Sequence, residues 1–398
     1  MRRPRSSPWS EMSSVVNFDA YESSVNSTND AASGSKELGG GALFYPVDPL
    51  DLDRFAPIHR ELRKFALELG LSDLGAAPVG DARTYELFLE RVRAGQCGNL
   101  SYLTENPEKR RNPRSAMSDA KTLIVVALSE ARLVAETNEL RANPFDAPEL
   151  RSESSEVGGT IVGYATALDY HDVLRQKLKR LASFVKERFP GASTRGTVDT
   201  APILEKDWGR AAGIGFVGLN SLLTSPKLGS RFFLGELLVS IPFETLTGFA
   251  TTEEYLAARR ESLRFDPDAA ELACLSCRRC VDACPTTALP GDRTLDARRC
   301  LNFWTIENRD EIPPDIAEKL EGRLFGCDIC RTVCPRNAKI EAAPPRELPL
   351  DAVERLDDAT FRRLFKKTPV FRATVDGLKR SARAIEKERE RKKSPTTE

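Results

Sequence analysis

The pattern of apolar and polar residues predicts helices that alternate with strands from about residue 57 onward. Apolar residues at helical spacing, closed by glycine or by Pro-Gly, predict three helices at 58–69, 85–92 and 171–189. Aliphatic and β-branched runs predict strands at 122–128, 160–166, 194–198, 216–223 and 232–241. An alanine-rich helix is expected after the strand at 194–198. Strands that alternate with helices favour an α/β or α+β class, with a catalytic domain over 53–265.

The flanking regions differ in composition from this central part of the chain. Residues 1–52 are rich in Ser, Asn, Gly and acidic residues, so we expect a disordered extension that is dispensable or reflects a start codon placed too early. Residues 341–398 are expected to form a basic helical tail, since 361–398 carry 13 Lys/Arg against 5 Asp/Glu in a chain of zero net charge. The tail either contacts an anionic partner or is a solvated charged helix.

Composition limits the possible locations and chemistry. No apolar run approaches the ~18 residues that a membrane span needs, and no signal peptide is evident, so we expect a cytoplasmic protein, and a monomer. Histidine is nearly absent, with only His59 and His171, and no nucleophile elbow, P-loop or dinucleotide fingerprint occurs. A general acid is therefore expected to be a carboxylate, a tyrosine or a lysine.

The cysteines between 274 and 334 predict two [4Fe–4S] clusters in a ferredoxin-like domain over 266–340. The first run has the C-x2-C-x2-C-x3-C-P spacing in which three thiolates hold one cube and the fourth crosses to the other. A second full run would begin with cysteine at the position of Leu324, and Cys300 is the available substitute. The predicted ligands are therefore Cys274, Cys277, Cys280 and Cys334 for cluster 1, and Cys284, Cys300, Cys327 and Cys330 for cluster 2.

Two other interpretations of these cysteines are weaker. Structural zinc prefers two C-x2-C pairs with a longer spacer, which the three-in-a-row spacing does not match. Disulfides need an oxidising compartment and are typical of small secreted domains. The ninth cysteine, Cys97, lies in a polar loop without a nearby histidine, and we interpret it as a spectator.

Local sequence leaves the role of Asp199 open. It follows the predicted strand at 194–198, at the kind of strand end where open α/β sheets bind ligands. It also precedes Thr-Ala-Pro202, and an aspartate before a first turn that contains proline is ordinary helix capping. Asp169, before the long helix, is expected to be an N-cap. The glycine-spaced turn at 213–218 either approaches a large cofactor or only serves the turn.

Several strings of the chain resemble epoxyqueuosine reductases: Val198–Glu205, Gly213–Ser221, Phe232–Leu238, Leu295–Cys300, Thr305–Glu307 and Gly326–Cys330. The resemblance covers about 57–385. It implies a cobalamin in the α/β domain, next to the clusters, and reduction of epoxyqueuosine to queuosine in tRNA with electrons from an unidentified low-potential donor. Cobalamin could collect single electrons from the clusters for a two-electron reduction.

The resemblance also implies roles for individual residues. Asp199 matches the family's proton donor, and donation at neutral pH would need a raised pKa, which burial beside a corrinoid could supply. The residues expected at the cobalamin, by position in the family pattern, are Arg110, Tyr164, Asp199, Asn220, Ser221, Cys327 and Asp328.

The chain departs from the family pattern in three places. It lacks basic residues in 163–168, it has Leu219 where a lysine is usual, and its tail is shorter than the helical repeats of longer members. These losses weaken the expected contacts with an anionic cofactor or with tRNA phosphate. They leave two alternatives, a diverged corrinoid reductase of a small molecule and an iron–sulfur electron-transfer protein.

Overall fold

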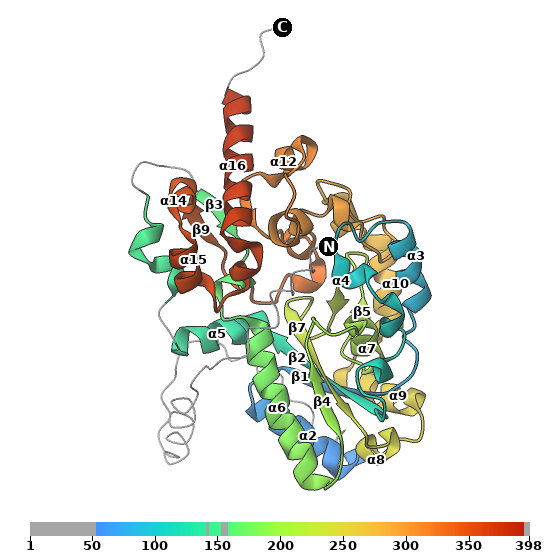
Figure 1. The fold of residues 1–398 in the computed structure, drawn as a ribbon. Helices are drawn as coiled ribbons and strands as arrows, with labels where there is room; N and C mark the ends of the chain where they lie inside the picture. The colour runs from blue at the N-terminus through green and yellow to red at the C-terminus, as the bar shows by residue number, and fades with distance from the viewer. Residues whose placement is uncertain (1–52, 141–142, 153–157, 394–398) are drawn as a thin grey trace, which may run out of the picture. The chain divides into compact units, whose positions relative to one another are not determined.

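The computed structural model describes residues 53–140, 143–152 and 158–393 (Figure 1). The extension expected over 1–52 lies outside the described residues. Within them, no helix is long and apolar enough to cross a membrane.

The main sheet has four strands in the order β1, β2, β7, β4, and all neighbouring pairs are antiparallel. The strands are β1 (Asp73–Pro78), β2 (Thr122–Ser129), β4 (Thr194–Thr197) and β7 (Phe232–Val239). The strands expected at 122–128, 194–198 and 232–241 are thus confirmed, and the fold is mixed α/β. Neighbouring strands run in opposite directions, so the edge of the sheet beside Asp199 contains both amino and carboxyl ends of strands.

The rule that ligands bind at the carboxyl ends of parallel strands therefore does not apply to Asp199.

Helices cover both faces of the main sheet (Figure 1). On one face lie α2 (Pro57–Glu68) and α6 (Tyr170–Arg188), and on the other α3 (Tyr85–Arg93) and α7 (Glu205–Ala211). β2 contributes alternate residues to the two cores, with Ile124 on the α6 side and Leu123 on the α7 side. Burial on both faces explains why β2 reads as a continuous aliphatic run. The three helices expected from apolar spacing are confirmed.

A second, three-stranded sheet joins distant parts of the chain. β3 (Gly158–Ile161) pairs in parallel with β8 (Arg323–Phe325) and antiparallel with β9 (Arg346–Pro349). The strand expected at 160–166 is therefore wrong in its second half, which forms the 3-10 helix η7 (Gly163–Thr166). The backbone bends there against Ala343, whose carbonyl oxygen would lie 1.8 Å from a Cβ on residue 163.

The predicted tail is largely built into a second hydrophobic core. It forms α14 (Leu350–Arg355), α15 (Asp358–Phe365), the 3-10 helix η11 (Pro369–Ala373) and α16 (Thr374–Lys393). Residues of these elements pack with Phe145, Leu150 and Ile161. Arg380 of α16 is buried and donates to backbone carbonyls of the 304–310 segment. A fully solvated helix is thus the wrong description of α16, although its exposed positions remain charged.

The remaining elements are short. The strand expected at 216–223 is instead a hairpin of β5 (Phe216–Val217) and β6 (Leu223–Thr224), and Gly215 lies so close to Thr224 that a Cβ would meet its carbonyl oxygen at 2.1 Å. The other helices are α4 (Ser101–Thr104), α5 (Glu130–Leu140), α8 (Phe243–Thr247), α9 (Thr252–Leu263), α10 (Pro267–Cys277), α11 (Arg279–Asp282), α12 (Pro314–Leu320) and α13 (Ile329–Thr332). Single turns are η3 (Pro107–Arg110), η4 (Pro113–Ser115), η5 (Pro144–Asp146), η6 (Pro148–Leu150), η8 (Ala297–Arg299), the π-helical η9 (Phe303–Glu307) and η10 (Pro335–Asn337).

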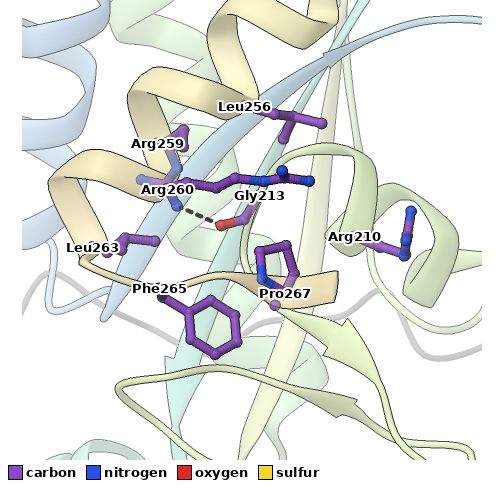
Figure 2. Close-up of a pocket in the computed structure, with 9 residues that line it drawn as sticks. Arg210, Gly213, Leu256, Arg259, Arg260, Leu263, Phe265 and Pro267 are labelled. Carbon is purple, nitrogen blue, oxygen red and sulfur yellow. Dashed lines mark hydrogen bonds between the residues drawn. The ribbon is translucent and has the colours of Figure 1, made fainter. Parts of the chain in front are cut away.

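A buried ion network fixes α2 and α9 to the start of the main sheet. Asp73 of β1 pairs with Arg63 at 3.2 Å and with Arg259 at 3.1 Å, and all three side chains are nearly inaccessible to water. Arg259 also donates to the carbonyl of Gly213, the contact drawn in Figure 2 at a small hollow beside α9. Burial and these two arginines lower the pKa of neighbouring His59 to about 3, so its imidazole is neutral. Each member of the network is paired within it, so its role is structural.

This network predicts a large loss of stability in the variant Asp73→Asn. The substitution leaves two buried guanidinium groups without their carboxylate, which typically costs about 3–5 kcal/mol. Urea denaturation of the purified protein would measure the loss. The control Glu261→Gln breaks an exposed pair between α9 and Arg54 and should cost less than about 1 kcal/mol. Equal losses in the two variants would contradict the role of the buried network.

Candidate active site and cluster cysteines

Asp199 stands at a strained turn between β4 and α7. Its φ of +44° lies in the left-handed region that residues other than glycine seldom adopt. Its backbone N–H donates to Glu205 Oε1 at 2.5 Å, which holds the turn against the first residue of α7. The N-cap of α7 is Leu204, so the interpretation of Asp199 as a helix cap is wrong. Backbone strain of this kind, which the surrounding structure must offset, is common at functional positions.

The carboxylate of Asp199 is the meeting point of several side chains. Its Oδ2 accepts hydrogen bonds from the Tyr170 hydroxyl and pairs with His171 Nε2, both at 3.1 Å. Arg372 of η11 lies 3.6 Å from the same oxygen. The other ring nitrogen of His171, Nδ1, lies 2.7 Å from Asp169, which also caps α6 as expected. His171 is thus held between two carboxylates.

These contacts set the protonation states of the two residues. Burial favours the neutral acid, but the hydrogen bond from His171, the charge of Arg372 and the bond from Tyr170 outweigh it, and the pKa of Asp199 is lowered to about 2. The raised pKa expected for Asp199 beside a bound corrinoid stays a prediction. Burial opposes a charged His171, yet its bonds to Asp169 and Asp199 raise the pKa of the imidazole above its ordinary value. The contacts between the two residues thus favour the proton on His171 over the proton on Asp199.

Two further carboxyl groups lie behind Asp199. Glu236 of β7 is 0% exposed and accepts a hydrogen bond from the Thr197 hydroxyl at 3.0 Å, while its Oε1 has no partner among the described residues. Burial raises the pKa of Glu236 to about 8. Burial, followed by the charge of Glu236, likewise raises the pKa of Glu205 well above its ordinary value. Glu236 is therefore mostly protonated near neutral pH, and the neutral form of Glu205 is favoured as well.

An aromatic wall flanks this carboxyl cluster. The ring of Tyr170 stacks on Phe233 with centroids 4.1 Å apart, and Tyr164 meets Phe233 edge-on at 5.8 Å. All three side chains are only partly buried. Tyr102 is 52% exposed, and Asp199 is among the charges that raise its pKa. A half-open aromatic surface beside an acid suits a large ligand with an apolar face.

The other residues expected at a cofactor occupy different places. Arg110 donates to the carbonyls of Ala201 and Tyr102 and so braces the loop after Asp199. Ser221 accepts hydrogen bonds from Lys206, the residue next to Glu205. Asn220 accepts the N–H of Leu222 and lines a cavity beside the cluster 1 cysteines instead of facing Asp199.

Sequence reasoning missed several residues of this site. Tyr170, Glu205, Glu236 and Arg372 were not singled out, and His171 was noted only for its rarity. Glu236 sits in an otherwise apolar strand, and that single charge was a usable signal. Arg372 comes from a distant part of the chain and left no local signal.

The eight cysteines influence one another in two sets, and their assignment as cluster ligands stays a prediction. Burial, together with the charges of Cys274 and Cys334, raises the pKa of Cys280 to about 11, and burial with Cys274 and Cys277 raises the pKa of Cys334. In the second set burial, together with the charges of Cys327 and Cys284, raises the pKa of Cys300 to about 11. Burial raises the pKa of Cys330, and the charges of Cys300 and Cys327 also raise it. Each group thus gathers thiols from both runs, with Cys300 in the place that Leu324 leaves vacant.

The nine cysteines are all free thiols, and Cys97 is buried with a raised pKa, consistent with a spectator. A cavity of about 360 Å³ is lined by Cys274, Cys277, Cys280 and Cys334. In the described parts of the chain, no three acidic, histidine or cysteine side chains converge as ligands of a single ion would. Leu219, which replaces the usual lysine, is fully buried against Cys280, and its N–H donates to the sulfur of Cys274 at 3.4 Å.

A buried ion cluster joins the cluster 2 segment to the main sheet. Arg331 follows Cys330 and pairs with Asp328 at 3.0 Å and with Glu130, the first residue of α5. Arg231, just before β7, pairs with Asp328 at 3.4 Å and with Glu130 at 3.6 Å. Tyr164 and Cys327 pack against the same hydrophobic core, so the cluster 2 segment and the aromatic wall are neighbours. Burial, and after it the charge of Asp328, raises the pKa of Tyr164.

Two family models match the chain. Residues 110–200 match the DUF1730 model of epoxyqueuosine reductase, and residues 273–337 match a 4Fe-4S double cluster binding domain. The epoxyqueuosine reductase of Cyclobacterium marinum is 32% identical over 82% of this chain and 96% of its own length.

Solved structures agree with these matches. The epoxyqueuosine reductase of Streptococcus thermophilus is 29% identical, with a TM-score of 0.64 over 84% of this chain and 82% of the other. An epoxyqueuosine reductase crystallised with a modified tRNA-Tyr stem loop is 26% identical, with a TM-score of 0.63 over 82% and 80%. The chain, with its double cluster domain, therefore belongs to the epoxyqueuosine reductases, the oxidoreductases of tRNA queuosine biosynthesis.

Proposed function

We propose that this chain reduces epoxyqueuosine in tRNA with electrons that pass from cluster 1 through cluster 2 to a cobalamin, and with a proton delivered through Asp199. The observation that carries this proposal is the Asp199–His171 pair beside an aromatic wall that adjoins the cluster 2 segment. Removal of the epoxide oxygen as water consumes two electrons and two protons. The clusters supply the electrons, Asp199 delivers the first proton to the opening epoxide, and solvent supplies the second as the oxygen leaves as water.

The residues around Asp199 fit a cobalamin. Tyr164, Tyr170 and Phe233 present a partly open aromatic face large enough to line one side of a macrocycle, and Asp328 lies next to Tyr164. When bound, a cobalamin would supply the low-potential reductant that turns single electrons into a two-electron reduction. We assign Tyr164, Asp328 and the Ser221 turn to its binding, with Cys327 reached through cluster 2. Arg110 would act through the loop that it braces.

The proton path begins at His171. In the protein alone Asp199 is ionised, and the imidazolium of His171 holds the transferable proton 3.1 Å away. Displacement of water by cofactor and substrate favours the neutral acid, because desolvation raises a carboxyl pKa. His171 then passes its proton to Asp199, which donates to the oxygen of the opening epoxide. Asp169 stabilises the charged imidazole before transfer and fixes its orientation.

The tRNA partner is supported by the related enzyme crystallised with a tRNA stem loop. Near the site, Lys366 and Lys367 are exposed and have no ion-pair partner among the described residues. The carbonyl of Lys367 accepts the N–H of Asp169, which places this pair at the start of α6, beside His171. We assign the two lysines to phosphate contacts of the bound stem loop.

The variant Asp199→Asn is expected to reduce turnover of epoxyqueuosine in tRNA by about 10²- to 10⁴-fold, because it keeps the shape of the carboxylate and removes the transferable proton. Wild-type turnover should fall as pH rises through the raised pKa of His171, and this fall should disappear in His171→Gln. Mass spectrometry of tRNA nucleosides measures turnover.

The control is Asp172→Asn, a half-exposed carboxylate next to His171 on α6 that pairs with Arg175. It should keep near wild-type turnover. Full activity of Asp199→Asn would remove Asp199 from the proton path and leave the electron path untouched.

The buried Glu236 predicts a pH-dependent stability. The unfolded state loses this proton near its ordinary pKa of 4.5 and the folded state only near 8, so Glu236 destabilises the fold progressively as pH rises between these values. Glu236→Gln cannot ionise, so its melting temperature relative to wild type should rise over the same range. Glu187→Gln, at a 69% exposed position, should show no such trend. A constant difference would contradict the raised pKa.

The assignment of the lysine pair predicts a change in the salt dependence of tRNA binding. Lys366→Ala and Lys367→Ala should each weaken stem-loop binding and reduce the slope of log affinity against log salt by about one. The double variant Lys179→Ala, Lys186→Ala on the exposed side of α6 is the control. Filter binding over a range of salt concentrations would give the slopes, and unchanged slopes would exclude these phosphate contacts.

A further inference from the structure

The two cysteine groups differ in their access to solvent. Cys277 of cluster 1 is exposed, whereas each cysteine of cluster 2 is partly buried. The cavity lined by the cluster 1 cysteines is also lined by Arg278, Arg279 and Arg336. Cluster 1 is therefore the place where electrons can enter, since cluster 2 adjoins the aromatic wall.

The surface around this opening is basic. Arg278, Arg279 and Arg336 are exposed, and none of them has an ion-pair partner among the described residues. The Arg278 side chain lies against Gly291, and a Cβ at position 291 would lie 2.9 Å from its guanidinium. Asp282 is the exposed acid of the adjoining helix α11, so positive charge prevails. Many other basic side chains of the chain, including Arg210 and Arg260 nearby, are neutralised by carboxylates.

The two exposed leucines of α10 lie away from the cavity. Leu272 is 68% exposed and Leu275 is 43% exposed, whereas the α10 residues that line the cavity are Ala270, Ala273, Cys274 and Cys277. At about 100° per residue these two sets point to roughly opposite sides of the helix. We name the surface formed by Arg278, Arg279 and Arg336 around the cavity the cluster 1 face.

We propose that the cluster 1 face docks a small acidic one-electron carrier protein of the ferredoxin class, which supplies the electrons of the reaction. This proposal rests on the electron path proposed above. In each encounter one electron leaves the reduced carrier and enters oxidised cluster 1, and two encounters supply the pair of electrons for one epoxide.

The position of the face favours a protein over RNA. Its arginines line the cavity of cluster 1 beside the exposed Cys277, and RNA cannot supply the electrons that this cluster receives. Positive charge around a redox centre guides an acidic carrier and speeds its encounter, so that weak binding is enough. The proposed phosphate contacts of the stem loop, Lys366 and Lys367, lie instead at the start of α6.

The test measures binding directly, with the cluster-loaded enzyme and an acidic plant-type ferredoxin as the probe. The triple variant Arg278→Glu, Arg279→Glu, Arg336→Glu is expected to weaken ferredoxin binding by at least about 10-fold at low salt, and added salt should narrow this difference. The matched control carries the same change of charge at Lys64, Lys179 and Lys186 on α2 and α6, and should bind ferredoxin as the wild type does. Iron content and absorbance establish that each variant holds its clusters.

A second variant keeps the test decisive if charge reversal disturbs cluster 1. Arg278→Gln with Arg336→Gln removes two positive charges without adding negative charge beside the cysteines, and it should weaken ferredoxin binding severalfold at low salt and less at high salt. Leu272→Ser with Leu275→Ser, on the other side of α10, should leave ferredoxin binding unchanged.

Three outcomes would overturn the proposal: no binding of ferredoxin to the wild type, equal loss in the arginine variant and its control, or loss of stem-loop binding by the arginine variant with ferredoxin binding intact. The last outcome would identify the face as an RNA contact. Turnover driven by a small chemical reductant tests the proposed function separately, so the two can fail independently.

Discussion

One buried ion cluster connects the redox part of the chain to its catalytic part. Arg331 and Arg231 share the carboxylates of Glu130 and Asp328, and Glu130 is only 2% exposed. Breaking a buried network of this kind by removing one partner is costly, because the remaining charges stay out of water. The arrangement therefore fixes the cluster 2 segment against the ends of β2 and β7, and the distance between the cysteines and Asp199 follows from it.

The second constraint is which of three closely spaced carboxyl groups, Asp199, Glu205 and Glu236, carry a proton. Asp199 is surrounded by groups that favour its charge, whereas burial raises the pKa of both Glu205 and Glu236. A negative charge on Asp199 makes ionisation of Glu205 and Glu236 still less favourable. The site thus combines a partly exposed Asp199 carboxylate, held by the buried His171, with two acids behind it whose neutral forms are favoured.

Family membership and site geometry together argue against the alternative that the chain is only an electron-transfer protein. An electron-transfer protein that merely docks a partner would have no need for a strained Asp199 held by Tyr170, His171 and Arg372. The lysine missing from the glycine turn is not a simple loss either. Leu219 occupies a closed position against Cys280, where a charged side chain would be buried.

The sequence by itself determined the main strands and helices and the family, and it predicted the cluster ligands and a role for Asp199. These features have local signals: cysteine spacing, apolar periodicity and short strings of residues. Tertiary structure alone decided that Asp199 is not a cap, that its pKa is low in the protein alone, and that Arg372 and Glu236 belong to its surroundings. Each of these depends on groups brought together from distant segments, and a carboxyl pKa responds to every charge and to the burial around it. The antiparallel order of the main sheet and the pairing of β3 with β8 and β9 are also properties of long-range contacts, which periodicity along the chain does not record.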